Sequence, residues 1–195
     1  MISRRSLMSS AAVAAGAALT CMVVPRASKG AVPPISQADH EKYMRLAIAE
    51  SAHTRNIPNA AVIVKPATGE VMARGINNSD YDPLLHGQLA CVQDYIRRNG
   101  NREWDECVLY TISEPCTMCQ SALVFAGIAG TVYGSSIEGV NRGGVENPRI
   151  RAKDIVEASS FYKGFIIGGI LADETDKIFL ERANRKKWEI RLYKR

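Results

Sequence analysis

Hydrophobic and polar positions repeat along this chain with two different periods, which distinguish its expected helices from its expected strands. Residues 36–39 fit a capping box, which is typical of a helix start. After them, small and apolar side chains recur at helical spacing, at Met44, Ala47, Ile48, Ser51 and Ala52. This period predicts an amphipathic helix that runs to about Arg55. Residues 60–65 and 71–76 form short apolar runs separated by turn residues, which predicts two strands that pair with each other.

The rest of the chain alternates between helical stripes and short apolar runs. Residues 77–83 predict a loop, and Asp82-Pro83 at its end predicts the start of a helix that closes at Asn99-Gly100. Three further strands are expected at residues 107–112, 131–134 and 165–170, and three further helices at residues 116–126, 152–158 and 173–188. Residues 135–150 hold many Gly, Asn and Ser and predict a surface loop. Because strands alternate with helices after the opening hairpin, we expect one sheet with helices packed on both faces.

Length and charge narrow the choice of fold and partner. With 195 residues, of which 46% are hydrophobic, the chain suits one globular domain with a core of its own. The formal net charge of +5 suggests nucleic-acid binding, but residues 31–176 carry more acidic than basic side chains. The positive charge sits in residues 1–30 and 177–195, at the two ends of the sequence. This distribution does not predict a basic face spread over the fold.

The first 30 residues have the pattern of an export signal. A polar head ends in Arg4 and Arg5, residues 7–24 are uncharged and mostly apolar, and residues 25–30 then break the run. The paired arginines resemble the twin-arginine signal, whose pathway exports folded proteins; an ordinary secretion signal that happens to carry two arginines is the alternative. We therefore predict a periplasmic or secreted protein with a signal peptide at 1–30, a linker at 31–38 and a single domain at 39–195. No other segment is apolar enough to cross a membrane, so we expect no membrane contact after signal removal.

Cys116 and Cys119 stand three residues apart in the first turn of an expected helix, which puts both thiols on one face. A helix N-terminus favours negative charge and therefore favours thiolates at these positions. The spacing alone fits a redox pair, half of a structural zinc site, or chance. Cys91 and Cys107 lie in apolar stretches and are expected to be buried thiols, although a disulfide between them would also fit an oxidising compartment.

His86, 30 residues before Cys116, gives the cysteine pair a partner. Residues 86–88, His-Gly-Gln, and 115–119, Pro-Cys-Thr-Met-Cys, match the zinc deaminase signature H-x-E followed by P-C-x-x-C, except at its glutamate. One imidazole and two thiolates balance the charge of Zn²⁺ and leave its fourth position for water, as in catalytic rather than structural sites. We therefore predict one Zn²⁺ per chain, held by His86, Cys116 and Cys119. The other two histidines, His40 and His53, lie in or beside the first expected helix, and we expect them to be solvated.

Four stretches make residues 39–188 resemble the cytidine-deaminase-like superfamily, in the branch that holds tRNA adenosine deaminases, guanine deaminases and fungal-type cytosine deaminases. The first strand of the family resembles residues 57–64, and its two zinc motifs resemble residues 82–88 and 114–119. Its last strand, with the entrance of the last helix, resembles residues 168–174. One departure is Ala60, where family members usually have Gly. The resemblance implies an α/β fold, a three-layer α-β-α sandwich around a five-stranded mixed sheet, often as a homodimer.

The resemblance also implies a reaction and a set of substrate contacts. Family members remove an amino group hydrolytically from an amidine-like carbon of a base or related ring, with zinc polarising water and a glutamate carrying the protons. The backbone near Ala61, and an Asn in the loop before the histidine, would hold the substrate. Here that Asn corresponds to Asn77 or Asn78. The expected partner molecule is a small base or nucleoside.

Gln88 stands where the family has its catalytic glutamate. A neutral amide is nearly isosteric with the carboxylate, but it cannot accept and return a proton at neutral pH. Three interpretations stay open from the sequence: a substitution made to trap substrate, a natural protein that binds without turnover, or another acid in the same role. For the last interpretation, Glu114 beside the cysteines is the nearest candidate in sequence.

The function expected first is thus a zinc-dependent hydrolytic deaminase of a small nucleobase, nucleoside or related heterocycle, crippled by Gln88. The alternative from another class is a non-catalytic, zinc-containing protein that binds a ligand on the same fold. A third is tRNA adenosine deamination, suggested by the basic C-terminal residues Lys177, Arg182, Arg185, Lys186, Lys187, Arg191, Lys194 and Arg195. A solvated helix face with a charged tail explains those residues more simply. An exported protein would not meet tRNA, so we do not expect a nucleic-acid partner.

Overall fold

A computed structural model describes the backbone of residues 32–193 and the side chains of residues 32–184. Within that part of the chain, strands form one sheet in the order β2-β1-β3-β4-β5. The strands are β1 (Ala60–Lys65), β2 (Glu70–Ile76), β3 (Val108–Ser113), β4 (Gly130–Ser135) and β5 (Phe165–Gly168). Strand β1 pairs antiparallel with β2 and β3, whereas β3, β4 and β5 run parallel, which confirms the expected five-stranded mixed sheet. The predicted signal peptide at 1–30 lies outside the described residues.

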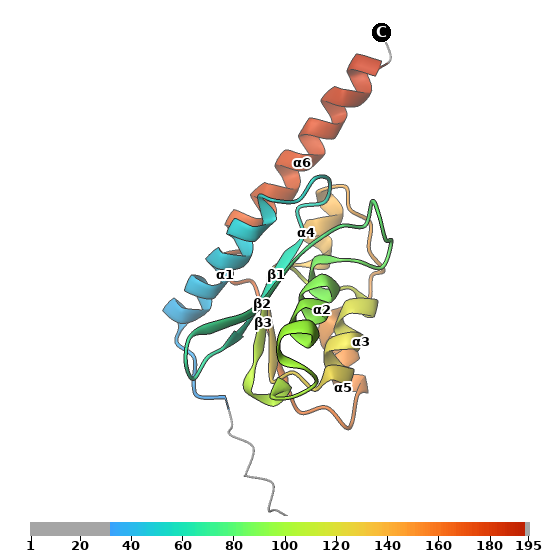
Figure 1. Cartoon of the computed structure of the whole chain (residues 1–195). Helices are drawn as coiled ribbons and strands as arrows, with labels where there is room; N and C mark the ends of the chain where they lie inside the picture. The colour runs from blue at the N-terminus through green and yellow to red at the C-terminus, as the bar shows by residue number, and fades with distance from the viewer. Residues whose placement is uncertain (1–31, 194–195) are drawn as a thin grey trace, which may run out of the picture.

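Helices cover both faces of this sheet (Figure 1). They are α1 (Gln37–Ser51), α2 (Gly87–Asn99), α3 (Thr117–Ala126), α4 (Ile137–Arg142), α5 (Ala152–Ala158) and α6 (Ala172–Tyr193), with a short 3₁₀ turn at Trp104–Glu106. Helices α1 and α6 lie on one face, and α2, α3 and α5 lie on the other. Helix α4 follows β4 and packs against α6. This arrangement confirms the expected α-β-α sandwich.

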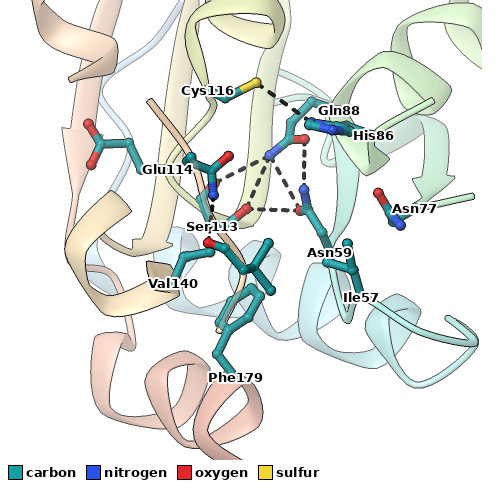
Figure 2. Close-up of a pocket in the computed structure, with 12 residues that line it drawn as sticks. Ile57, Asn59, Asn77, His86, Gln88, Ser113, Glu114, Cys116, Val140 and Phe179 are labelled. Carbon is teal, nitrogen blue, oxygen red and sulfur yellow. Dashed lines mark hydrogen bonds between the residues drawn. The ribbon is translucent and has the colours of Figure 1, made fainter. Parts of the chain in front are cut away.

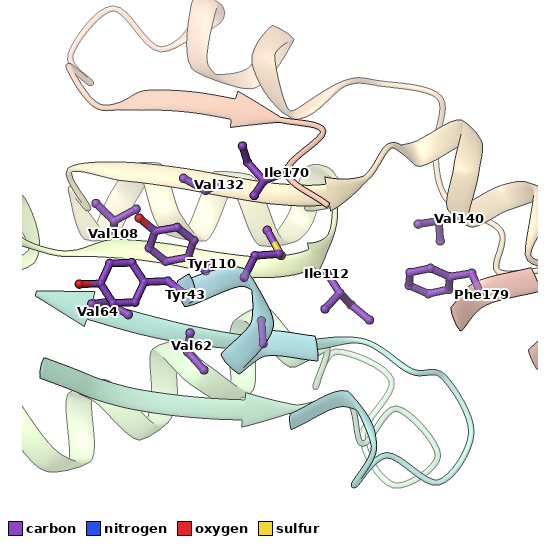
Figure 3. Close-up of a cluster of buried hydrophobic side chains, with 12 residues drawn as sticks. Tyr43, Val62, Val64, Val108, Tyr110, Ile112, Val132, Val140, Ile170 and Phe179 are labelled. Atoms are coloured by element: carbon purple, nitrogen blue, oxygen red, sulfur yellow. The ribbon is translucent and has the colours of Figure 1, made fainter. Parts of the chain in front are cut away.

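Alternate residues of the central strands supply two separate hydrophobic cores. On the face covered by α1, Val62 and Val64 of β1 pack with Tyr110 of β3 (Figure 3). Ala61 and Ile63 point to the opposite face, where they join buried residues of α2 and α3. Fully burying a large aliphatic side chain contributes about 1.5–3 kcal/mol. The two cores therefore fix the sheet firmly between its helical layers, and with it the strand ends that carry the site described below.

Helix α1 starts where the sequence predicts but ends earlier. Ser36 is its N-cap residue, and the Ser36 hydroxyl accepts a hydrogen bond from the Asp39 amide. The helix ends at Ser51 rather than near Arg55, because the amides of residues 52–54 bond to carbonyls three positions back and tighten the chain into a turn.

Helix α2 begins later than expected. The sequence predicts its start at Asp82-Pro83, whereas the structure begins it at Gly87, with His86 as the N-cap residue. Asp82 instead forms a turn, since its carboxylate accepts from the Leu84 amide and its carbonyl accepts from the Leu85 amide. The Asp-Pro pair is therefore turn chemistry that comes before the helix rather than the helix start itself.

The expected loop at residues 135–150 contains helix α4. Ser136 caps this helix by accepting from the Gly139 amide. A Cβ at Gly139 would lie 2.6 Å from a carboxylate oxygen of Asp176, so the absence of a side chain lets α4 approach α6 closely. The glycine content that predicts a loop here permits helix packing instead.

The end of β5 and the start of α6 are set by two residues in left-handed conformation. Strand β5 ends at Gly168, two residues before the expected end, since Gly169 and Leu171 have φ values of +86° and +53° and turn the chain into α6.

Among the described residues, none of the helices combines the length and the apolar character needed to cross a membrane.

His40 is a buried residue, which corrects the expectation that it is solvated. Its Nδ1 atom lies 3.0 Å from the hydroxyl oxygen of Tyr110, and the residue is only 7% exposed. The reason is its place on the sheet-facing side of α1, above β3. His53, the other histidine expected to be solvated, is exposed.

Candidate metal centre

Three metal-ligating side chains converge where two neighbouring helices begin, and Figure 2 shows two of them, His86 and Cys116. His86 is the residue before α2, Cys116 is the residue before α3, and Cys119 lies in the first turn of α3. The Nδ1 atom of His86 lies 3.6 Å from the sulfur of Cys116 and 3.5 Å from the sulfur of Cys119. The two sulfur atoms are 3.6 Å apart. The structure thus brings together the three residues that the sequence predicts as ligands.

The spacing of these atoms fits a tetrahedral zinc ion. With Zn–S distances of about 2.3 Å and Zn–N distances of about 2.0–2.1 Å, tetrahedral ligand atoms stand roughly 3.5–3.8 Å apart. Both cysteines are buried and the histidine is partly buried, which limits competition from solvent. One imidazole and two thiolates suit zinc and leave one of its four positions to another group. His86, Cys116 and Cys119 therefore form the zinc site that the sequence predicts.

The two thiols of this site share charge unequally. The hydrogen bond between the two sulfur atoms, supported by one with His86, holds the pKa of Cys116 at about 4 although burial opposes this. The same bond and burial raise the pKa of Cys119. Cys116 also stands at the positive end of the α3 dipole, which favours an anion. The pair thus favours a thiolate at Cys116, and metal binding would release the proton that remains on Cys119.

Gln88, in the first turn of α2, is 1% exposed and lies beside the zinc ligands (Figure 2). Its Oε1 accepts from Asn59 Nδ2 at 3.0 Å, and its Nε2 donates to Thr111 Oγ1 at 3.0 Å. The same Nε2 lies 3.3 Å from the hydroxyl and 3.4 Å from the carbonyl oxygen of Ser113. The amide is therefore held at both ends by side chains of β3 and of the segment before β1.

The groups around Gln88 are arranged for an amide rather than for a carboxylate. The hydroxyl of Thr111 donates to the Ala60 carbonyl, and the hydroxyl of Ser113 donates to Asn59 Oδ1. Both hydroxyl oxygens therefore present lone pairs to the NH₂ group of Gln88, and the Ser113 carbonyl can only accept. A carboxylate at position 88 would need both hydroxyls to rotate, and it would still face that carbonyl.

Glu114 borders the site, but its carboxylate points away from the zinc ligands (Figure 2). It accepts from the guanidinium of Arg151 and from the backbone amides of Ile137 and Ala152. The structure therefore does not bring this acid to the position of a proton carrier, the role that its place in the sequence suggested.

A small cavity lies beside the zinc ligands. Its volume is about 20 Å³, which is room for roughly one water molecule. Val140 of α4 and Phe179 of α6 close it on one side, and Ile57 closes it on the other (Figure 2). Asn77 and Asn147 add amide groups to its wall. The cavity thus combines a metal site, neutral polar groups and an apolar cover.

The structure distributes the expected substrate contacts unevenly. Asn77 is buried and lines the cavity, whereas Asn78 is exposed. Ala61 lies within β1, in the core under α2, and not in the cavity wall. Asn59 lines the cavity and contacts Gln88, although its place in the sequence predicts no role for it. The signal that points to it is a polar residue directly before a strand of five consecutive apolar residues.

One of the basic residues near the C-terminus, Arg182, is buried. Arg182 is 6% exposed, and its guanidinium donates to the Asn56 carbonyl at 2.8 Å and to the carbonyls of Gly143 and Gly144. It is therefore part of the packing of α6 and not of an exposed basic patch. The side chains of residues 185–195 lie outside the described part of the chain.

Comparisons with known proteins add to this geometry. Residues 37–135 match the family model of the cytidine and deoxycytidylate deaminase zinc-binding region. The guanine deaminase of Bacillus subtilis is 32% identical over 101 residues, which cover 49% of this chain and 64% of that protein. The probable cytosine deaminase of Schizosaccharomyces pombe is 29% identical over 140 residues, which cover 68% of this chain and 85% of that protein. The tRNA-specific adenosine deaminase of Aquifex aeolicus is 29% identical over 98 residues, which cover 48% of this chain and 64% of that protein.

Solved structures share the fold. Guanine deaminase from Nitrosomonas europaea superposes with a TM-score of 0.64 at 20% identity, covering 78% of this chain and 87% of that one. Guanine deaminase from Bacillus subtilis superposes with a TM-score of 0.52 at 28% identity, covering 55% of this chain and 71% of that one. The matched stretch spans less than two thirds of several curated relatives, and only 23% of the tRNA(Ile)-lysidine synthase of Deinococcus radiodurans.

Proposed function

This chain belongs to the cytidine and deoxycytidylate deaminase zinc-binding family, and from that premise we propose that it is a zinc-dependent scaffold for hydrolytic deamination of a small nucleobase, nucleoside or related heterocycle, with turnover suppressed by Gln88. The observation that carries the proposal is the buried Gln88 amide next to the site of His86, Cys116 and Cys119. Relatives named as guanine and cytosine deaminases support the substrate class.

Hydrolytic deamination exchanges an amino group for oxygen. The oxygen of water bonds to the ring carbon and the C–N bond breaks. Of the two protons of water, one leaves with the amino nitrogen as ammonia and the other stays on the neighbouring ring nitrogen. One group must therefore accept a proton from water and deliver it to the leaving nitrogen. Zinc, when bound, supplies the Lewis acid for this reaction.

Position 88 is the place in this site from which such a proton could be carried. The Gln88 side chain has the shape of a glutamate, but an amide neither gains nor loses a proton near neutral pH. Glu114 does not replace it, since Arg151 and two backbone amides occupy its carboxylate. Asn77 offers hydrogen-bonding groups to a ring, and Phe179 helps to exclude bulk water.

The test is ammonia release across a panel of purine and pyrimidine bases and nucleosides, with the unchanged protein beside Gln88→Glu. We expect the unchanged protein to be almost inactive and Gln88→Glu to raise turnover by at least about 10²-fold, the lower end of what a positioned general acid–base contributes. Burial raises the pKa of a carboxyl group, which would move the introduced glutamate toward the neutral range where a proton carrier works. Substrate affinity should change much less.

Gln88→Met is the matched control, because it keeps a similar length but offers no proton acceptor. It should stay as inactive as the unchanged protein. Robust ammonia release by the unchanged protein would contradict the proposal, since another group would then carry the proton.

A non-catalytic ligand-binding protein is the second candidate, and the surroundings of Gln88 favour it. Thr111 and Ser113 both accept from the NH₂ group of Gln88, so the surroundings of position 88 suit an amide that binds without turnover. If this candidate is right, Gln88→Glu releases no ammonia from any compound of the panel. Calorimetric titration of the zinc-loaded, unchanged protein should then still detect binding of a base or nucleoside.

A further inference from the structure

Glu114 is a buried carboxylate that the proposed reaction does not use. It lies between Ser113, the last residue of β3, and the Pro115-Cys116 step that leads into α3. Its side chain is 1% exposed. A carboxylate at this depth is tolerated only when its oxygens are well paired.

The bonds that Glu114 makes link it to several segments beside the zinc site. Arg151 Nε lies 2.9 Å from both carboxylate oxygens, and Arg151 Nη2 lies 2.8 Å from Oε2. The backbone amide of Ile137 donates to Oε2 at 3.0 Å, and that of Ala152 donates to Oε1 at 2.9 Å. The amide of Glu114 itself donates to the Ser135 carbonyl at 2.7 Å. Backbone and side chain together therefore fix this residue in place.

Two helices begin at this carboxylate, and a third, α3, begins three residues after Glu114 in the sequence. Ile137 is the first residue of α4 and Ala152 is the first residue of α5, so Glu114 satisfies an amide at each N-terminus. Negative charge is favourable at both places because of the helix dipoles. Cys116, two residues after Glu114, is the residue before α3. A displacement of Glu114 would therefore move a zinc ligand and release two helix starts.

We propose that Glu114 is a positioning residue of the zinc site. It holds the backbone of Cys116 so that the thiolate meets His86 and Cys119, and it holds α4 so that Val140 covers the cavity. It acts through the position of the chain and touches neither the metal nor a substrate.

Glu114→Gln tests this proposal, since the amide keeps the volume of the carboxylate but loses its charge. The new NH₂ group would face the guanidinium and backbone amides, all of which are donors. We expect the zinc dissociation constant, measured by competition with a chelator, to rise roughly tenfold or more, as it does when groups that orient metal ligands are lost. The visible absorption spectrum of Co²⁺-substituted protein, which reports ligand geometry, should shift as well.

Asp94→Asn is the matched control. The Asp94 side chain is 10% exposed and accepts from Arg97, from Arg98 and from the Arg74 amide, so it is also a largely buried, paired carboxylate. It lies about two turns along α2 from His86. We expect this variant to lower the melting temperature but to leave the zinc dissociation constant and the Co²⁺ spectrum unchanged.

Unchanged zinc affinity and an unchanged spectrum in Glu114→Gln would overturn the proposal. An equal loss of affinity in Asp94→Asn would also overturn it, because the effect would then be general destabilisation. If Glu114→Gln does not fold, Arg151→Lys takes its place, since it keeps the charge but loses the forked contact. It should weaken zinc binding in the same direction, and affinity equal to that of the unchanged protein would overturn the proposal. None of these measurements needs turnover, so their outcome is separate from that of the proposed deamination.

Discussion

At position 40, a histidine buried in α1 makes the stability of the fold depend on pH. Its imidazole lies against the phenol of Tyr110, away from water. Burial lowers the pKa of His40, and the neighbouring Asp39 carboxylate offsets this only in part. The unfolded chain, in which the pKa is about 6.5, therefore takes up a proton at a higher pH than the folded chain does. The stabilisation is complete above about pH 6.5 and is lost as the pH falls below that value.

We expect the free energy of unfolding, from urea titrations, to fall between about pH 7 and pH 5 with a slope of at most about 1.4 kcal/mol per pH unit from this one histidine. His40→Gln should flatten that part of the profile, since Gln still offers Tyr110 a hydrogen bond but does not titrate. His53→Gln removes an exposed histidine and should leave the profile unchanged. Identical profiles for all three proteins would show that His40 does not control the slope.

At the scale of helices and strands, the elements with local signals are those that the sequence predicts well. Strand β1 and helix α5 have the predicted bounds, and α3 begins one residue late because Cys116 serves as its cap. Helix α4 is not predicted, because a short helix depends on tertiary packing, here against α6, which composition does not reveal. The start of α2 is misplaced for a related reason, since the turn at Asp82 uses the same residue types as a helix cap.

The same distinction separates the parts of the site. The zinc ligands could be predicted because each lies in a short motif at a characteristic spacing. The partners of Gln88 could not, because Thr111 and Ser113 reach it only through the packing of β3 under α2. Thr111 pairs with Ala61 of β1, and this register is a property of the whole sheet rather than of either strand.

Because two helix starts supply the ligands, losing one ligand from each should abolish metal binding. Elemental analysis of the purified protein should find about one zinc per chain, and almost none in the double variant His86→Ala, Cys116→Ser. Cys107→Ser makes the same change at a buried free cysteine at the other end of β3, and it should keep the metal. Stoichiometric zinc in the double variant would refute the site.

For the molecule as a whole, the zinc-binding thiols bear on the route of export. The sulfur atoms of Cys116 and Cys119 lie 3.6 Å apart, so a metal-free site could be oxidised to a disulfide in an oxidising compartment. Loading the metal first and exporting the folded protein avoids this reaction. We therefore propose a twin-arginine route to a periplasmic or secreted location. That route and the expected homodimer stay predictions.

Changing Arg4 and Arg5 together to Lys should leave the protein in the cytoplasm, as measured by immunoblotting of cell fractions, because the twin-arginine pathway reads the arginine pair. Arg26→Lys, in the same N-terminal segment, is the control and should be exported normally. An unchanged exported yield after the double change would favour the ordinary secretion signal.

The small volume of the cavity beside the zinc ligands has a consequence for the rate at which a ring would bind. With room for roughly one water, it cannot admit a ring while Val140 of α4 and Phe179 of α6 keep their positions. A ring would enter only after these side chains move aside, and it would leave only after they move again. The frequency of that movement, rather than diffusion, would then limit both the association rate and the residence time. A ring captured in this site would exchange slowly with solution even where its equilibrium affinity is modest.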